Sequence, residues 1–240
     1  MITLLSTTTH LETIEIEPEQ PATASIIWLH GLGADARDFY SVPPQLGLPA
    51  ELCIRYVFPN APQIPVTINM GSIMRAWYDV TGSVSRDEDR QRIRRSMAWI
   101  NELVAREVDR GVAQDRIVLA GFSQGGAMAL CAGLRYPEAV AGVMCLSGYL
   151  LLPETLQAEA SESNRQLPIF QAHGTQDTVV PYALGRSGHD TLRAAGYPVA
   201  WHEYSMGHQV CLEELRDISD WLTHTLQRGS VSSAPRREPR

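Results

Sequence analysis

Short apolar runs rich in β-branched residues recur along the chain and predict seven β-strands. They are TIEIE (13–17), SIIWLHG (25–31), IRYVFPN (54–60), RIVLAG (116–121), GVMCLSG (142–148), PIFQAHG (168–174) and VAWHEYS (199–205). Several runs are continuously apolar rather than alternating, which is typical of strands covered on both faces. We therefore expect a largely parallel sheet.

Amphipathic patterns with the helical period lie between these runs. In segment 87–111 apolar residues recur at steps of three or four, at Ile93, Met97, Ile100, Val104 and Val108. Three further helices are predicted, after Ser123 up to Arg135, from about Pro181 to Ala195, and over VCLEELRDISDWLTHTL (210–226). Strands alternating with helices predict an α/β fold, a mostly parallel doubly wound sheet with helices on both faces.

Composition favours one domain over residues 1–228, because 240 residues with 44% hydrophobic content suffice for one substantial core. The final stretch GSVSSAPRREPR (229–240) is small, polar and basic, and we expect it to be disordered.

The charge balance and the apolar runs exclude some function classes. A formal net charge of −7 argues against a nucleic-acid partner. No apolar run has the roughly 18 residues of a membrane span, and the first residues do not resemble a signal peptide. We therefore expect a cytoplasmic protein without stable membrane association. The four cysteines are scattered, and we interpret them as reduced and structural.

The stretch LAGFSQGGAMAL (119–130) places Ser123 between a predicted buried strand and a predicted helix. A serine at the apex of such a tight turn needs small neighbours, and Gly121, Gly125 and Gly126 meet that need. An ordinary glycine-rich turn is the alternative, because the five-residue pattern alone is weak evidence. The strand and helix around it favour a nucleophilic serine.

Two backbone amides are candidates to stabilise a developing oxyanion. Gln124 opens the helix after the serine, and Leu32 lies in the glycine-bearing turn that follows an early strand. The same turn, Gly31-x-Gly33-x-x-Ala36, could be a dinucleotide loop. That alternative is weak, because Asp38 follows far too soon to be the expected ribose-binding acid.

A nucleophilic serine needs a histidine base and an acid to orient it, usually in the chain order Ser, acid, His. Among the later carboxylates, Asp177 follows a buried strand directly, whereas Asp190 falls on a helix face. Among the seven histidines, His208 follows the last strand and precedes a helix. The sequence predicts Asp177 as the acid and His208 as the base, although each could be an ordinary loop residue.

No metal site is expected, since no metal-binding His or Cys spacing occurs. Residues 59–87 contain no clear element, and their apolar Met74 and Trp77 are candidates to line an acyl pocket. Packing of these two side chains in the main core is the alternative.

Seven motifs in order carry a resemblance to a known family: WLHGLGAD, FPNAP, PVTINMG, AWYD, GFSQGGAMAL, HGTQDTVVP and YSMGHQV. They resemble the bacterial carboxylesterases and acyl-protein thioesterases of the phospholipase/carboxylesterase family, over about residues 22–227. The resemblance implies an α/β-hydrolase fold, a Ser123–Asp177–His208 triad, oxyanion amides from Leu32 and Gln124, and hydrolysis without a cofactor. Many relatives carry proline where this chain has Thr178. Relatives often dimerise, so a homodimer is possible.

The predicted function is that of a carboxylesterase, a serine hydrolase whose substrate is a small, soluble ester with a short-to-medium acyl group. Two alternatives share this chemistry, an acyl-protein thioesterase and a lysophospholipase, since the pocket decides between such substrates. A third alternative is a binding protein with this fold and no turnover. All predicted triad residues are present, which favours the enzyme.

Overall fold

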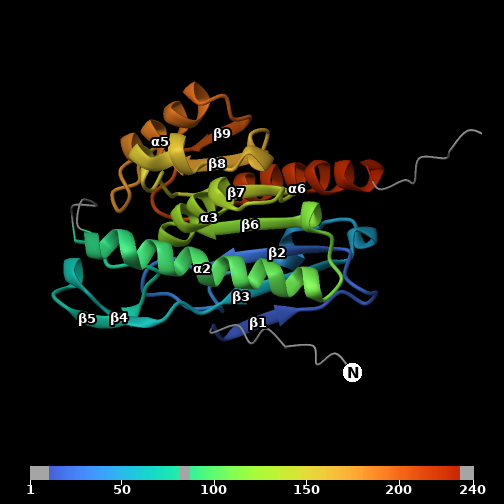
Figure 1. The fold of residues 1–240 in the computed structure, drawn as a ribbon, viewed down its shortest axis with the longest axis horizontal. Helices are drawn as coiled ribbons and strands as arrows, with labels where there is room; N and C mark the ends of the chain where they lie inside the picture. The colour runs from blue at the N-terminus through green and yellow to red at the C-terminus, as the bar shows by residue number, and fades with distance from the viewer. Residues whose placement is uncertain (1–10, 82–86, 233–240) are drawn as a thin grey trace, which may run out of the picture.

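The computed structural model describes residues 11–81 and 87–232. A seven-stranded sheet in the order β1-β3-β2-β6-β7-β8-β9 forms its centre (Figure 1). The strands are β1 (Thr13–Ile16), β2 (Ala24–Leu29), β3 (Ile54–Pro59), β6 (Ile117–Phe122), β7 (Gly142–Leu146), β8 (Ile169–Gly174) and β9 (Val199–Tyr204). β1 runs antiparallel to β3 and the other pairings are parallel. The predicted α/β fold is confirmed.

Six α-helices accompany the strands in the described residues. They are α1 (Pro43–Leu46), α2 (Asp87–Asp109), α3 (Gln124–Arg135), α4 (Leu156–Glu159), α5 (Tyr182–Ala194) and α6 (Leu212–Ser232), with short 3₁₀ turns between some elements. The four long ones are the four that the sequence predicts. None of the helices in these residues has the length and apolarity needed to span a bilayer.

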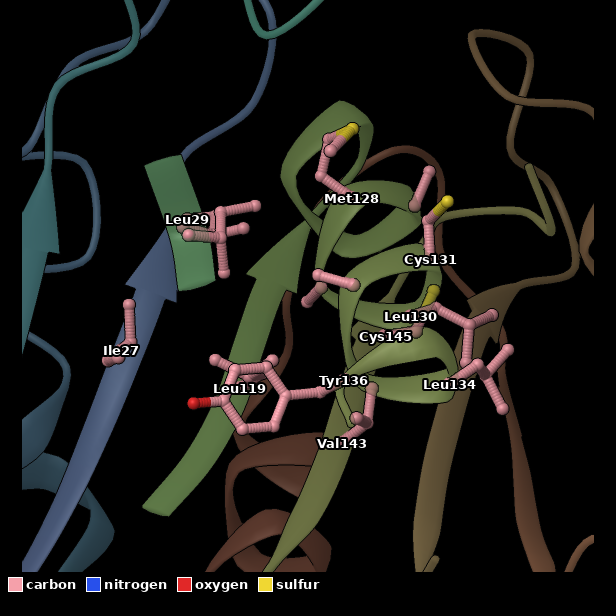
Figure 2. Packing of buried hydrophobic residues seen from close by; sticks show 14 of the residues in the cluster. Ile27, Leu29, Leu119, Met128, Leu130, Cys131, Leu134, Tyr136, Val143 and Cys145 are labelled. Atoms are coloured by element: carbon pink, nitrogen blue, oxygen red, sulfur yellow. The ribbon is translucent and has the colours of Figure 1, made fainter. Parts of the chain in front are cut away.

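Alternating strand residues separate two hydrophobic cores, one on each face of the sheet. Ile27 and Leu119 belong to the core under α2 and α3, which lie in front of the sheet in Figure 1. Figure 2 shows side chains of this core, with Met128, Leu130 and Leu134 on α3 and Ile27, Leu119 and Val143 on the strands. Ile26 and Val118 belong to the other core, which includes the inward face of α6. Coverage on both faces explains why these strands lack alternating polarity.

One predicted apolar position of a helix and one predicted helix end differ from the structure. Val108 is 37% exposed, because each step of four residues turns a side chain about 40° further around α2. At the other end of the chain, α6 extends through Ser232 and so includes residues 229–232 of the predicted disordered tail. Adding a residue to an existing helix gains a backbone hydrogen bond at little further cost. Residues 233–240 lie outside the described part of the chain.

A second, two-stranded sheet occupies the stretch for which the sequence predicts no element. β4 (Gln63–Val66) pairs antiparallel with β5 (Ser72–Arg75). The turn between them contains Met70 and Gly71, both with positive φ, and the Gly71 amide donates to the Val66 carbonyl at 2.9 Å. This hairpin escaped prediction because polar and apolar residues do not alternate regularly along it.

Two fully buried glutamates differ in their surroundings. Glu107 lies within 2.9 Å of Arg55, 3.3 Å of Arg106 and 2.9 Å of Arg110. Glu214 on α6 has no side-chain hydrogen-bond partner among residues 11–81 and 87–232. Burial raises the pKa of Glu214 to about 8, and the nearby Asp217 carboxylate raises it further. Glu214 is therefore largely protonated at neutral pH.

Glu214→Gln should stabilise the protein at alkaline pH. Unfolded Glu214 releases its proton near pH 4.5 whereas the folded protein retains it to about pH 8, so stability falls as pH rises between these values. The neutral glutamine removes that loss, and we expect a gain on the order of 2 kcal/mol or more at pH 8 and almost none at pH 4.

Urea unfolding at several pH values measures this difference. Glu213→Gln, on the exposed side of the same helical turn, is the control and should change stability by less than about 0.5 kcal/mol. A gain that does not depend on pH would show that Glu214 is ionised in the folded protein.

Candidate active site

Ser123 occupies a strained turn between β6 and α3. Its φ of 54° and ψ of −120° are rarely adopted by a residue with a side chain. The Ser123 amide donates to the Leu146 carbonyl at 2.8 Å, and the Ser123 carbonyl accepts from the Ala127 amide at 3.0 Å. Bonds to β7 on one side and within α3 on the other hold the serine in this conformation.

Close backbone contacts around the turn explain its glycines. A Cβ atom on Gly121 would lie 2.3 Å from the Gly125 carbonyl group, and one on Gly125 would lie 2.3 Å from the Leu29 carbonyl oxygen. Strand and helix therefore touch main chain to main chain. A larger residue at either position would force β6, α3 and β2 apart.

His208 and Asp177 meet at the carboxyl ends of β9 and β8. The His208 Nδ1 atom lies 2.7 Å from the Asp177 Oδ2 atom. The side chain of Asp177 is fully buried and that of His208 is 15% exposed. Because a carboxylate only accepts, this contact places the proton on Nδ1 and leaves Nε2 as the basic nitrogen.

The rest of the Asp177 carboxylate is also hydrogen-bonded. Its Oδ1 atom accepts from the amides of Val179 and Val180, each at 2.9 Å. The His208 ring packs on the ring of Phe122, with centroids 4.7 Å apart, and Phe122 directly precedes the serine. These contacts fix the acid and hold the imidazole next to the strained turn.

Hydrogen bonds of a buried histidine, His30, hold the start of the turn that contains Leu32. His30 Nε2 accepts from the Ala61 amide at 3.0 Å, and the His30 carbonyl accepts from the indole of Trp77 at 3.0 Å. Burial lowers the pKa of His30, while its contact with the Gly31 carbonyl opposes that change. A neutral His30 thus ties the Leu32 turn to the chain around residues 61 and 77.

A pocket of about 590 Å³ brings the predicted residues together. Ser123, His208, Leu32 and Gln124 all line it, and Asp177 lies directly behind His208. Apolar and aromatic side chains form much of the remaining wall, among them Ile68, Tyr78, Val80, Ile93, Val180 and Leu184. A pocket with this lining and volume has the size and character of a site for a small apolar ligand or acyl group.

Trp77 and Met74 are not among the residues that line this pocket. Trp77 is 1% exposed and directs its indole N–H toward the His30 carbonyl, so it packs in the core. Met74 lies behind Gly33, where its sulfur accepts from the Asn69 side chain at 3.1 Å. The predicted segment does wall the pocket, but through its neighbours Ile68, Tyr78 and Val80.

Sequence reasoning missed the function of the Gln124 side chain. Its Oε1 atom accepts from the Trp77 amide at 2.8 Å and its Nε2 atom donates to the Tyr78 carbonyl at 2.9 Å. The residue after the serine thereby fastens the pocket wall to the start of α3. The sequence signal that could have indicated this function is a single polar side chain, Gln124, at the start of a helix whose next residues, GGAMAL, are small or apolar.

Two other kinds of candidate site in residues 11–81 and 87–232 are clusters of metal-ligating side chains and the cysteine thiols. No group of three or more His, Cys, Asp or Glu residues there could hold a metal ion. All four cysteines are free, and burial raises the pKa of Cys131 to about 11 and that of Cys145 to about 12. Such thiols are poor nucleophiles at neutral pH.

Comparisons with known proteins agree with this architecture. Residues 11–226 match the model of a family described as Phospholipase/Carboxylesterase. Acyl-protein thioesterase 1 of Neurospora crassa is 40% identical over 226 residues, which cover 90% of this chain and 92% of that protein. Acyl-protein thioesterase 1 of Gibberella zeae is 36% identical over 214 residues, which cover 85% of this chain and 91% of that protein.

Solved structures extend the likeness to the fold. Acyl-protein thioesterase 2 of Zea mays superposes with a TM-score of 0.78 at 31% identity, covering 90% of this chain and 99% of that one. SOBER1 of Arabidopsis thaliana gives a TM-score of 0.79 at 30% identity, covering 85% and 99%. The Bacillus cereus carboxylesterase, at 15% identity and a TM-score of 0.73 over 91% and 96%, shares the fold.

Gly125→Ala should destabilise the protein and abolish the strained turn. The new methyl group would meet the Leu29 carbonyl at 2.3 Å and the His30 carbonyl at 2.5 Å, and neither backbone can yield easily. We expect a loss of about 3 kcal/mol or more in the free energy of unfolding. The control is Gly207→Ala, where the nearest atom to the new methyl group would be the Gln176 carbonyl oxygen at 3.9 Å. Equal unfolding midpoints for the two variants would contradict the contact argument.

Proposed function

Because the chain belongs to the phospholipase/carboxylesterase family of α/β-hydrolases, we propose that it hydrolyses acyl thioesters and esters through Ser123, His208 and Asp177. The observation that carries this proposal is the 2.7 Å hydrogen bond between His208 and the buried Asp177. His208 lines the same pocket as the strained serine. An ordered base that shares a pocket with a serine hydroxyl is what acyl transfer to serine requires.

In the proposed reaction, the Ser123 oxygen attacks the acyl carbonyl while His208 Nε2 takes the hydroxyl proton. Asp177 stabilises the resulting imidazolium and keeps its ring oriented. The amides of Leu32 and Gln124 stabilise the oxyanion; the Gln124 amide suits this role because the first amides of a helix lack intrahelical partners. The imidazolium then protonates the leaving thiolate or alkoxide, and water, deprotonated by His208, releases the acyl group from the serine.

The sequence alone predicts a small soluble ester as the substrate, but the names of the relatives favour acyl thioesters of proteins. Two fungal relatives at 36% and 40% identity and a maize structure at 31% are named acyl-protein thioesterases. The apolar pocket wall supports an acyl group in either kind of substrate. Small-ester hydrolysis stays the second candidate, since esterase PE8 resembles the chain at 25% identity with a TM-score of 0.76, covering 90% of this chain and 99% of that one.

A matched substrate panel separates the two candidates. The panel contains an S-octanoyl peptide, the O-octanoyl serine version of that peptide, and octanoyl p-nitrophenyl ester. A thioesterase should give a higher kcat/KM on the S-acyl peptide than on its oxygen counterpart by more than the intrinsic difference in hydrolysis rate. Turnover of the p-nitrophenyl ester without turnover of either peptide would favour the small-ester candidate.

Ser123→Ala should lower kcat by on the order of 10⁶ while the protein stays folded. Asp177→Asn should lower kcat by on the order of 10⁴, because an amide no longer selects the productive histidine tautomer. Asp190→Asn is the control, since its carboxylate is 62% exposed and pairs with Arg186, and it should stay within a few-fold of wild type. A Ser123→Ala variant with more than about a hundredth of wild-type kcat would overturn the assignment.

Leu184→Trp should shorten the acyl chain that the enzyme prefers. Leu184 lines the pocket, and a larger ring there removes space for the far methylenes of an acyl group. Loss of contact with two methylenes, at about 0.8 kcal/mol each, should lower the decanoyl-to-butyryl ratio of kcat/KM by about tenfold. Leu212→Trp is the control, because Leu212 is 69% exposed and lies outside the pocket. An unchanged ratio in Leu184→Trp would remove this side chain from the acyl site.

A further inference from the structure

His173 lies beneath the Asp177 loop, and the proposed reaction does not use it. It belongs to β8 and is 1% exposed. Its Nε2 atom lies 2.9 Å from the Val180 carbonyl oxygen and 3.5 Å from the Asp177 Oδ2 atom. Because a carbonyl oxygen only accepts, Nε2 carries a hydrogen and donates it to the Val180 carbonyl, while the Asp177 carboxylate lies at the limit of hydrogen-bond distance.

The two groups near His173 Nε2, the Val180 carbonyl and the Asp177 carboxylate, belong to the two ends of a short loop. The Val180 amide donates to the Asp177 Oδ1 atom at 2.9 Å, so the loop is already closed by its own backbone. His173 adds a contact from the sheet to the carbonyl at one end and to the carboxylate at the other. The Oδ2 atom that it approaches is the one bonded to His208.

Neighbouring residues prevent the His173 ring from turning away. A Cβ atom on Gly185 of α5 would lie 2.4 Å from the ring Nδ1 atom, so the helix backbone presses on the imidazole. The Trp201 ring of β9 stacks on it at 6.4 Å and 17°, and the Tyr182 ring meets it edge-on at 6.1 Å and 84°. The ion-pair contact of this ring in the described residues is with the Asp177 carboxylate, whose Oδ2 atom lies 3.5 Å from Nε2.

We infer that His173 is a positioning residue that holds the Asp177 carboxylate in line with His208. The inference rests on the proposed function of Ser123, His208 and Asp177. His173 touches neither the pocket nor the serine among the described contacts, and acts through the place and orientation of the acid. A carboxylate displaced by even a fraction of an ångström would leave His208 poorly aimed without changing the pocket that binds substrate.

The test compares two amides of different reach with an apolar residue. In His173→Gln the side-chain N–H can occupy the place of Nε2, whereas in the shorter His173→Asn it cannot. His173→Leu removes the donor entirely. We expect the Asn and Leu variants to lose roughly tenfold to a hundredfold in kcat with KM within about twofold of wild type. The Gln variant should recover kcat to within about threefold.

His189→Leu is the matched control for loss of a histidine against Trp201. The His189 ring packs on Trp201 with centroids 5.0 Å apart, and within the described part of the chain it forms no hydrogen bond or ion pair with the Asp177 loop. Its substitution should leave kcat unchanged. If His173→Leu does not fold, the comparison of Gln with Asn decides the question.

Two outcomes overturn the inference. One is a kcat within threefold of wild type in a folded Asn or Leu variant, and the other is an equal kcat loss in the Gln and Asn variants, which would indicate packing alone. Ser123→Ala distinguishes this failure from failure of the proposed function. An inactive Ser123→Ala beside a fully active His173→Leu would remove His173 and leave the triad in place.

Discussion

Main-chain contact between β6 and α3 is the constraint on which the rest of this structure depends. The turn at Ser123 is so tight that Gly121 and Gly125 have no room for a side chain. The turn requires a strained serine conformation, at φ 54°. Two hydrogen bonds hold this conformation: the serine amide donates to a carbonyl of β7, and the serine carbonyl accepts from an amide of α3. Such strain is of order 1–3 kcal/mol, and the two cores on the sheet supply the stability that offsets it. The result is a hydroxyl at the head of a helix and at the edge of a pocket.

Residues far apart in the sequence converge on that turn by two different routes. From the carboxyl ends of β8 and β9 come Asp177 and His208, joined at 2.7 Å. From the other side, the Gln124 side chain binds the backbone of Trp77 and Tyr78 and so joins the pocket wall to the same helix. The acid, the base and the wall are therefore all positioned relative to one rigid junction of strand and helix.

The sequence predicts much of this arrangement, because local patterns specify it. Seven apolar runs and four amphipathic segments became the seven strands and four long helices, and the glycines around Ser123 signalled the turn. The pocket wall could not be predicted in the same way. Trp77 is a candidate pocket residue because it is aromatic and lies in a stretch without a clear element. In the structure its indole N–H donates to the His30 carbonyl, a tertiary contact that no local pattern contains. The Gln124 side chain and His173 were missed for the same reason, since their partners lie in other elements.

The most direct test of this account is the rate at which a fluorophosphonate labels the folded protein, with the labelled peptide identified by mass spectrometry. The account predicts a single label on Ser123, and a labelling rate that falls by on the order of 10³ or more in His208→Ala, because the serine is then without its base. Labelling at another residue, or equal rates for the wild-type protein and the variant, would contradict it.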